Sequence, residues 1–163
     1  MLKRIMRQTD DHAEDRDRLF EEALRYGMFG GAAPKKLDDL VPALRIKEFQ
    51  DEPIECHCSD ARHEAFIILE GKAAATRKLG PVEHIVDLVG FGAMFKMGGL
   101  VGHEDRFSGA RALGPTKVIA IDTELMNRAL AANGDLGYIC MKNLGRLMMM
   151  SMERQLDRHL AAL

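Results

Sequence analysis

Short apolar runs, separated by turn residues at intervals of about eight to twelve positions, fill the middle of the sequence over residues 41–122. Turns are expected at Glu70-Gly71, Gly80-Pro81 and Gly114-Pro115, because glycine and proline suit the backbone angles of tight turns. Several short runs in succession indicate a small sandwich or barrel rather than a parallel sheet. We therefore predict that residues 41–122 form an antiparallel, double-stranded β-roll of about eight strands, similar to a jelly roll.

Helical periodicity flanks this region on both sides, so the predicted fold class is α+β. Before it, apolar residues at helical spacing predict a helix over residues 10–26, and Pro34 begins a short helix that ends at Leu40. We divide the chain into three parts on this basis. They are an N-terminal helical lead-in (residues 1–40), the β-roll (residues 41–122) and the C-terminal helices (residues 123–163).

Two helices are predicted after the β-roll, separated by Asn133-Gly134. Asp122 or Thr123 caps the first, from Glu124 to Ala132, and Asp135 caps a longer one that reaches the end of the chain. A broad apolar face follows on the second helix, made by Met141, Leu144, Leu147, Met148, Met149, Met150, Met152, Leu156 and Leu160. So broad a face predicts a homodimer through this helix, although packing back on the β-roll explains the same pattern.

The composition argues against several classes of protein. Of the 163 residues, 47% are hydrophobic and 29% are charged, which is typical of a soluble globular domain. The formal net charge of -2 gives no electrostatic basis for nucleic-acid binding, and no apolar run is long enough for a membrane span. Three cysteines do not make a disulfide framework, so we expect a cytoplasmic protein. No catalytic motif is found, and an enzyme is not expected.

The segment from Gly90 to Ala112 has the features of an anion-binding site. Its glycines allow a tight bend or a close approach of the backbone to a ligand, and a short turn from Met97 to Val101 would present unpaired N–H groups. Arg106 follows this turn, and its planar guanidinium suits a phosphate or a carboxylate. A tight turn at a corner of the β-roll is the alternative explanation of the same glycines.

With these motifs in this order, the chain resembles the cyclic-nucleotide-binding domain of the catabolite-activator and anaerobic-regulator superfamily. FIILEGKAAA is similar to the family hairpin Y-x-I-x-x-G-x-x-x-V, with Gly71 as the turn glycine. The family's phosphate-binding cassette reads F-G-E-x-x-L, four residues, then P-R-x-A-T, and Phe95, Leu100 and Arg106 match it at the same spacing. The resemblance implies a ligand site formed by Phe95, Lys96, Met97, Gly98, Gly99, Leu100, Arg106, Phe107 and Ser108.

Departures from this cassette change the expected ligand. Met97 stands where the family has a glutamate that bonds the ribose 2′-hydroxyl, and a thioether is a poor acceptor. Losing that bond in a buried site lowers affinity by about tenfold to a hundredfold. Lys96 replaces a glycine, and Asp105 or Glu104 could pair with Arg106 in place of a phosphate. We therefore expect a small anion other than ordinary cyclic AMP, or else an empty pocket.

A second candidate site consists of Cys56, Cys58 and His63. Two thiolates and an imidazole suit zinc or another borderline-soft metal, so a metal or redox sensor is a lesser alternative. The Cys-x-Cys spacing is shorter than that of the usual zinc knuckle. Two half-buried cysteines beside a surface histidine explain the same residues.

The sequence thus predicts a free-standing sensor or regulatory domain that binds a small phosphate or other anion, requires no cofactor and signals through its C-terminal helix. The alternative is an interaction or scaffold module with a vestigial pocket, whose apolar C-terminal face binds a protein partner. Superfamily regulators carry a winged helix-turn-helix after the long helix, whereas this sequence ends at Leu163, so direct DNA binding is not expected. The identity of the ligand, the downstream partner, and whether the chain is part of a longer regulator stay open.

Overall fold

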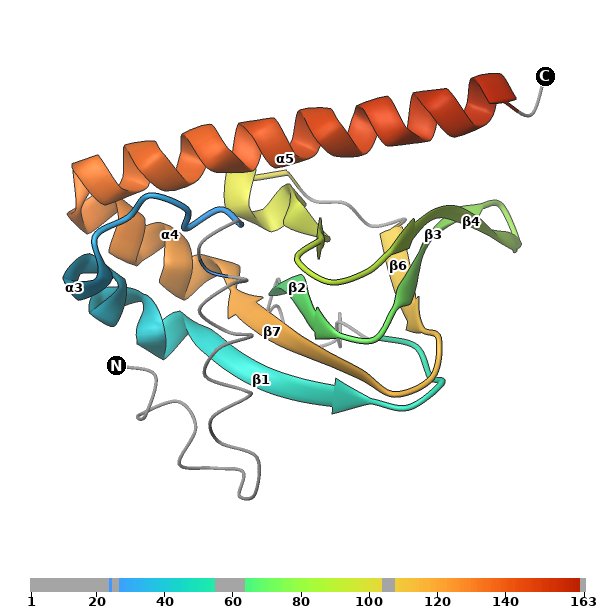
Figure 1. Cartoon of the computed structure of the whole chain (residues 1–163), viewed down its shortest axis with the longest axis horizontal. Coiled ribbons are helices and arrows are strands. Elements are labelled where there is room, and N and C mark those ends of the chain that lie inside the picture. The colour runs from blue at the N-terminus through green and yellow to red at the C-terminus, as the bar shows by residue number, and fades with distance from the viewer. Residues whose placement is uncertain (1–23, 25–26, 55–63, 104–107, 162–163) are drawn as a thin grey trace.

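The computed structural model describes residues 24, 27–54, 64–103 and 108–161. Within them, two antiparallel sheets form a β-roll, with strand orders β1-β7-β2-β5 and β4-β3-β6, and a long helix runs along one side (Figure 1). The strands are β1 (Leu44–Phe49), β2 (Glu64–Glu70), β3 (Ala73–Leu79), β4 (Val82–Val89), β5 (Met94–Phe95), β6 (Ser108–Ala112) and β7 (Thr116–Asp122). The helices are α3 (Pro34–Leu37), α4 (Thr123–Ala132) and α5 (Gly134–Ala161), with 3₁₀ turns η2 (Asp38–Ala43) and η4 (Met97–Val101).

The predicted antiparallel roll is confirmed, with differences in three places. The short helix that begins at Pro34 continues as the 3₁₀ turn η2, so β1 begins at Leu44. Pro53 and Ile54, whose sequence is also compatible with a short strand, do not form one: Pro53 makes a single isolated bridge to Arg111, because proline has no N–H to extend a ladder. The two-residue strand β5 was not predicted. The helix predicted over residues 10–26 lies almost wholly outside the described residues.

Strand β2 is buried on both faces, which explains its unbroken apolar run. Ala65, Ile67 and Leu69 point to a first core that the helices cover, together with residues of β1, β7, α4 and α5. Phe66 and Ile68 point to a second core between the two sheets. Because β2 also pairs with both β7 and β5, it connects the helical side of the molecule to the interior of the roll.

The caps of the two C-terminal helices are only partly as predicted. The Asp122 carboxylate accepts hydrogen bonds from the backbone N–H groups of Glu124 and Leu125 at 3.1 and 3.0 Å, which confirms the predicted cap of α4. Asn133 rather than Asp135 caps α5, since its side-chain oxygen accepts from the Leu136 N–H at 3.3 Å. The prediction of Asp135 was wrong because α5 begins at Gly134, immediately after Asn133.

The predicted apolar face of α5 divides into two halves. Leu144 is buried in the first core, and Met141, Leu147 and Met148 pack partly against it. Beyond that point the apolar residues are exposed, as Met149, Met150, Met152, Leu156 and Leu160 are all more than half accessible. Packing on the roll therefore accounts for the first half of this face and not for the second. No described helix is both long and apolar enough to cross a membrane.

Gly71, in the turn between β2 and β3, offers a test of how tightly the roll is closed. Its φ of +82° is in the left-handed region, and an added Cβ would lie 2.3 Å from the Pro115 carbonyl oxygen. We expect Gly71→Ala to lower the free energy of unfolding by about 3 kcal/mol, because strain and a backbone clash act together. Urea denaturation would measure this loss.

Gly80→Ala is the matched control, because its φ of +62° is also left-handed but an added Cβ meets no described atom within 4 Å. We expect it to cost only the conformational penalty, about 1 kcal/mol. Equal losses in the two variants would contradict the close approach of Pro115 to Gly71.

Candidate functional site

The turn predicted from Met97 to Val101 is the 3₁₀ turn η4, which follows β5 directly. Leu100 is buried and anchors the turn in the first core. The chain then returns on itself, as the His103 N–H donates to the Gly98 carbonyl at 2.9 Å. A Cβ at Gly98 would lie 2.7 Å from the His103 carbonyl oxygen, so a glycine is needed there.

Lys96 precedes this turn in a strained conformation. Its φ of 54° and ψ of 39° are left-handed, and it is the one described non-glycine residue with a positive φ. A left-handed conformation costs a residue with a Cβ on the order of 1–2 kcal/mol. The resemblance to the family cassette implies a glycine at this position, and a glycine would adopt this conformation without strain.

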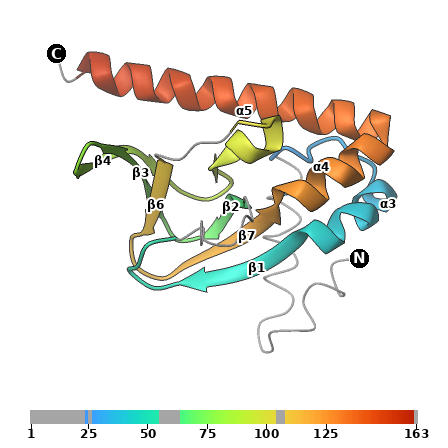
Figure 2. The same ribbon diagram turned by 180° about the vertical axis from the view of Figure 1, so that it is seen from behind.

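A cavity of about 320 Å³ lies beside η4. Its volume is at the lower end of the range for small-molecule sites. One wall is the turn itself, another is the sheet of β3, β4 and β6, and α5 closes it from above. Polar side chains reach it from each wall, including Thr76 and Asp87 from the sheet, Lys96 and His103 beside the turn, and Ser151 and Gln155 from α5. Figure 2 shows the distal half of α5 running alongside this sheet.

The structure brings part of the predicted site together. Phe95, Lys96, Met97 and Gly98 all line the cavity. The ring of Phe95 stacks on that of Phe66 with 5.2 Å between centroids, which joins the cavity wall to the second core. Met97 does lie at the cavity, where it presents a thioether in place of a carboxylate.

Other predicted residues are placed elsewhere or lie outside the described residues. Leu100 faces the core, and the Gly99 carbonyl accepts a hydrogen bond from Asn127 of α4 at 3.1 Å. Ser108 begins β6. Outside the described residues are Arg106, Phe107, Cys56, Cys58 and His63.

Asp87 is a cavity-lining residue that the sequence analysis did not single out. It is the one ionisable side chain among the buried described residues. Regular strand alternation would place it on one face with Ile85 and Val89, but Ile85 is 65% exposed. A β-bulge explains the difference, because Ala75 pairs with Asp87 while Thr76 pairs with Ile85, which leaves Val86 as the extra residue. An acidic residue two positions before the apolar Val89, and on the same strand face, was the available signal.

Two arginines of α5 approach this buried carboxylate. Arg158 contacts Asp87 Oδ1, and Arg154 lies 3.9 Å from Oδ2. Both arginine side chains are nearly half exposed, with accessibilities of 45% and 44%. Ion pairs therefore join β4 to α5 at the wall of the cavity.

The metal hypothesis for Cys56, Cys58 and His63 stays a prediction, because all three lie outside the described residues. Elsewhere in the described chain no group of three histidine, cysteine, aspartate or glutamate side chains could hold a metal ion. The third cysteine, Cys140, belongs to the first core. Burial raises the pKa of its thiol to about 11, so it is protonated at neutral pH and packs as an apolar group.

Comparison with known proteins agrees with this geometry. The family model described as the cyclic nucleotide-binding domain matches residues 47–133. A putative cyclic nucleotide-binding protein from Geobacter metallireducens is 23% identical and has a TM-score of 0.67, with 81% of this chain and 96% of that chain covered. A cyclic nucleotide-binding domain from Methylobacillus flagellatus is 17% identical and has a TM-score of 0.71, with 92% and 85% covered.

The sensor domain of the transcriptional regulator DNR from Pseudomonas aeruginosa is 16% identical and has a TM-score of 0.64, with 86% of this chain and 95% of that chain covered. At these identities the solved structures show a shared fold. No curated protein matches this chain in sequence.

The strained backbone of Lys96 predicts opposite effects on stability and on anion binding. Lys96→Gly should raise the free energy of unfolding by about 1 kcal/mol, and the melting temperature by about 3 °C, because glycine accepts the left-handed conformation without strain. The same change should weaken anion binding, since it removes a cation from the cavity. Lys96→Ala is the control, since it removes the cation and keeps the Cβ. Equal melting temperatures for the two variants would contradict the strain.

Proposed function

The chain belongs to the cyclic nucleotide-binding domain family, and on this premise we propose that it is a regulatory sensor domain that binds a small anionic ligand beside η4. The observation that carries the proposal is the cavity, because the cassette residues from Phe95 to Gly98 line it and α5 covers it. Lys96 and His103 supply positive or hydrogen-bonding groups at this wall. Its role would be binding rather than catalysis, with no cofactor required.

The ligand that fits best is a phosphate or another anion that does not depend on the ribose anchor of the family. Met97 offers no charge-assisted acceptor at the position where the family has glutamate, which disfavours ordinary cyclic AMP. Arg106, from its place in the cassette motif, would be the main anion ligand, and its backbone neighbours Phe107 and Ser108 would complete the site. Bidentate guanidinium contacts would compensate in part for the lost sugar contact.

A route for the signal runs through α4. Asn127 of this helix donates from its side-chain nitrogen to the Gly99 carbonyl of η4 at 3.1 Å, and the buried Met126 packs in the first core with Leu100. An anion that shifts η4 would therefore move α4, which leads directly into α5. In this proposal α5 transmits the change, because it contacts both α4 and the cavity.

We further propose that the exposed half of α5 pairs with a second copy of the chain. Met149, Met152, Leu156 and Leu160 follow a three- and four-residue spacing, and all are more than half exposed. They lie on a different side of α5 from Ser151 and Gln155, which face the cavity. The same exposed stripe is what favours the second candidate function, an interaction or scaffold module that binds a protein partner through α5 and has an unused cavity.

Thermal melts with cyclic AMP, cyclic GMP and inorganic phosphate test the ligand proposal. At a concentration about one hundred times the dissociation constant, a ligand stabilises the folded state by about 2.7 kcal/mol, which would raise the melting temperature by several degrees. We expect such a shift with at least one of these anions and its loss in Arg106→Ala. The control is Arg111→Ala, which removes a half-exposed arginine that faces Asp51 at 3.9 Å and does not line the cavity. No shift with any anion would favour the scaffold module.

Sedimentation of a matched pair of methionine variants tests the dimer. Met152→Glu places a charge in the exposed stripe and should convert the dimer to a monomer, because a carboxylate is costly to bury at an apolar interface. Met150 is also exposed but lies two residues away and thus on another side of the helix, so Met150→Glu should leave the dimer intact. A wild-type protein that sediments as a monomer would contradict the proposal directly.

A further inference from the structure

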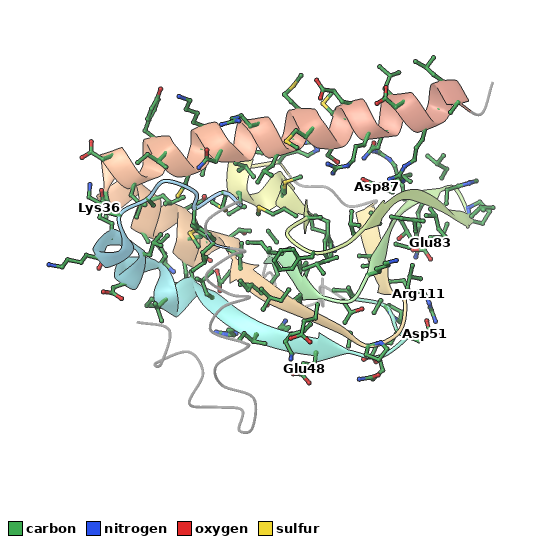
Figure 3. All side chains as sticks on the ribbon, viewed as in Figure 1. Lys36, Glu48, Asp51, Glu83, Asp87 and Arg111 are labelled. Atoms are coloured by element: carbon green, nitrogen blue, oxygen red, sulfur yellow. The ribbon has the colours of Figure 1, made fainter. Side chains whose placement is uncertain are left out.

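The buried carboxylate of Asp87 requires an explanation beyond ligand binding. Its side chain is only 2% exposed, although most of β4 around it is open to solvent. Figure 3 shows Asp87 on β4 beneath the distal half of α5. A buried carboxylate is unfavourable unless hydrogen bonds or opposite charges compensate for its lost hydration. Within the described part of the chain, neither of its oxygens accepts a hydrogen bond.

The compensation that the described residues provide comes from α5 alone. Arg158 contacts the carboxylate, and Arg154, one helical turn earlier, lies at 3.9 Å. Both arginine side chains remain nearly half exposed, so they keep part of their hydration. The interaction therefore joins a buried group of the roll to a helix that is otherwise at the surface.

Apolar packing does not hold this half of α5 on the roll. Leu136, Cys140 and Leu144 are the buried residues of the helix, and all of them precede Met148. From residue 149 to residue 161, Ser151 is the one described residue that is partly buried. The ion pairs with Asp87 are consequently the described side-chain interactions that join the distal half of α5 to the sheet.

Two polar side chains of the same segment line the cavity. Ser151 and Gln155 both reach it, and the Gln155 side-chain nitrogen donates to the Ser151 hydroxyl at 3.4 Å. They are interleaved with Arg154 and Arg158 along α5, so the position of the arginines sets theirs. We propose that Asp87 is a positioning residue: by holding Arg154 and Arg158 it keeps Ser151 and Gln155 over the ligand cavity.

The anchoring of α5 stands on this geometry alone, whereas the effect on the ligand rests on the proposed function. If the distal half of α5 moves away, Asp87 and both arginines regain water, which offsets much of the lost attraction. The ion pairs between Asp87 and the two arginines can therefore break and form again as the distal half of α5 moves. This movement would let a ligand enter and would then return the polar groups of α5 to their places.

Hydrogen exchange measured by mass spectrometry on the whole chain tests the anchoring. Asp87→Asn keeps the shape of the side chain and removes its charge, so residues 149–161 should exchange about tenfold faster while residues 134–148 stay unchanged. Asp51→Asn is the matched control, because Asp51 also faces an arginine, Arg111, but is exposed and remote from α5 (Figure 3). Unchanged exchange in residues 149–161, or an equal increase throughout the chain, would overturn the proposal.

A double-mutant cycle identifies the partner. Asp87→Asn and Arg158→Gln should each accelerate exchange in residues 149–161, and the double variant should be no faster than either one, because both remove the same ion pair. Arg154→Gln should have a smaller effect, since its guanidinium is farther away. Additive effects of the first two variants would overturn the assignment of Arg158.

Titration calorimetry with two probes tests the positioning role. The loss of the ribose anchor lowers the affinity of cyclic AMP but leaves it usable as a probe, and it fills more of the cavity lined by Ser151 and Gln155 than inorganic phosphate does. Asp87→Asn should weaken cyclic AMP binding by about tenfold and leave phosphate binding unchanged. An equal loss for both probes would indicate general damage and overturn the positioning role, and so would no loss for either. If the wild-type chain bound neither probe, the proposed function and the positioning role would both be overturned. The exchange experiments would still test the anchoring of α5 in that case.

Discussion

Because β2 is buried on both faces, it couples the two cores of the molecule and sets the position of β5 and η4 beside the cavity. Its alternate residues pack against the helices on one side and between the sheets on the other. Its edge pairs with β5, where Phe66 lies opposite Phe95, and η4 follows β5 after Lys96. The site thus begins at the most constrained strand of the fold.

The helix α5 has two different physical attachments along its length. Its first half is held by buried apolar side chains, which form a core that cannot open without a large loss of free energy. Its second half is held by charges that are close to water. An apolar stripe remains uncovered on that second half. This division allows the proposed signal to pass to the surface of α5 without disturbing the core, since only the weakly held half needs to move.

Much of the fold could be predicted from sequence, because turn glycines and strand-length apolar runs are local signals. The antiparallel roll, the Asp122 cap and the family resemblance are confirmed.

Strand β5 was missed because two residues are too few to show a period. Asp87 was missed because the bulge at Val86 interrupts the alternation of buried and exposed side chains along β4, from which burial is predicted. Ser151 and Gln155 were missed because helical periodicity identifies apolar faces, while this part of α5 turns a polar face to the cavity. For Arg106 the prediction is not tested, since it lies outside the described residues.

The bulge at Val86 has a further consequence for the β3–β4 hairpin. In a regular hairpin, adding or deleting one residue would turn every later side chain to the opposite face. Here the extra residue separates an inner section, where Ala75 pairs with Asp87, from an outer section that ends at Leu79 and Val82. Beyond Thr76 the outer section is exposed, and its turn at Gly80 is open. The tip of this hairpin is consequently a suitable place to graft a reporter peptide, because a change in its length would not alter the residues that face the interior.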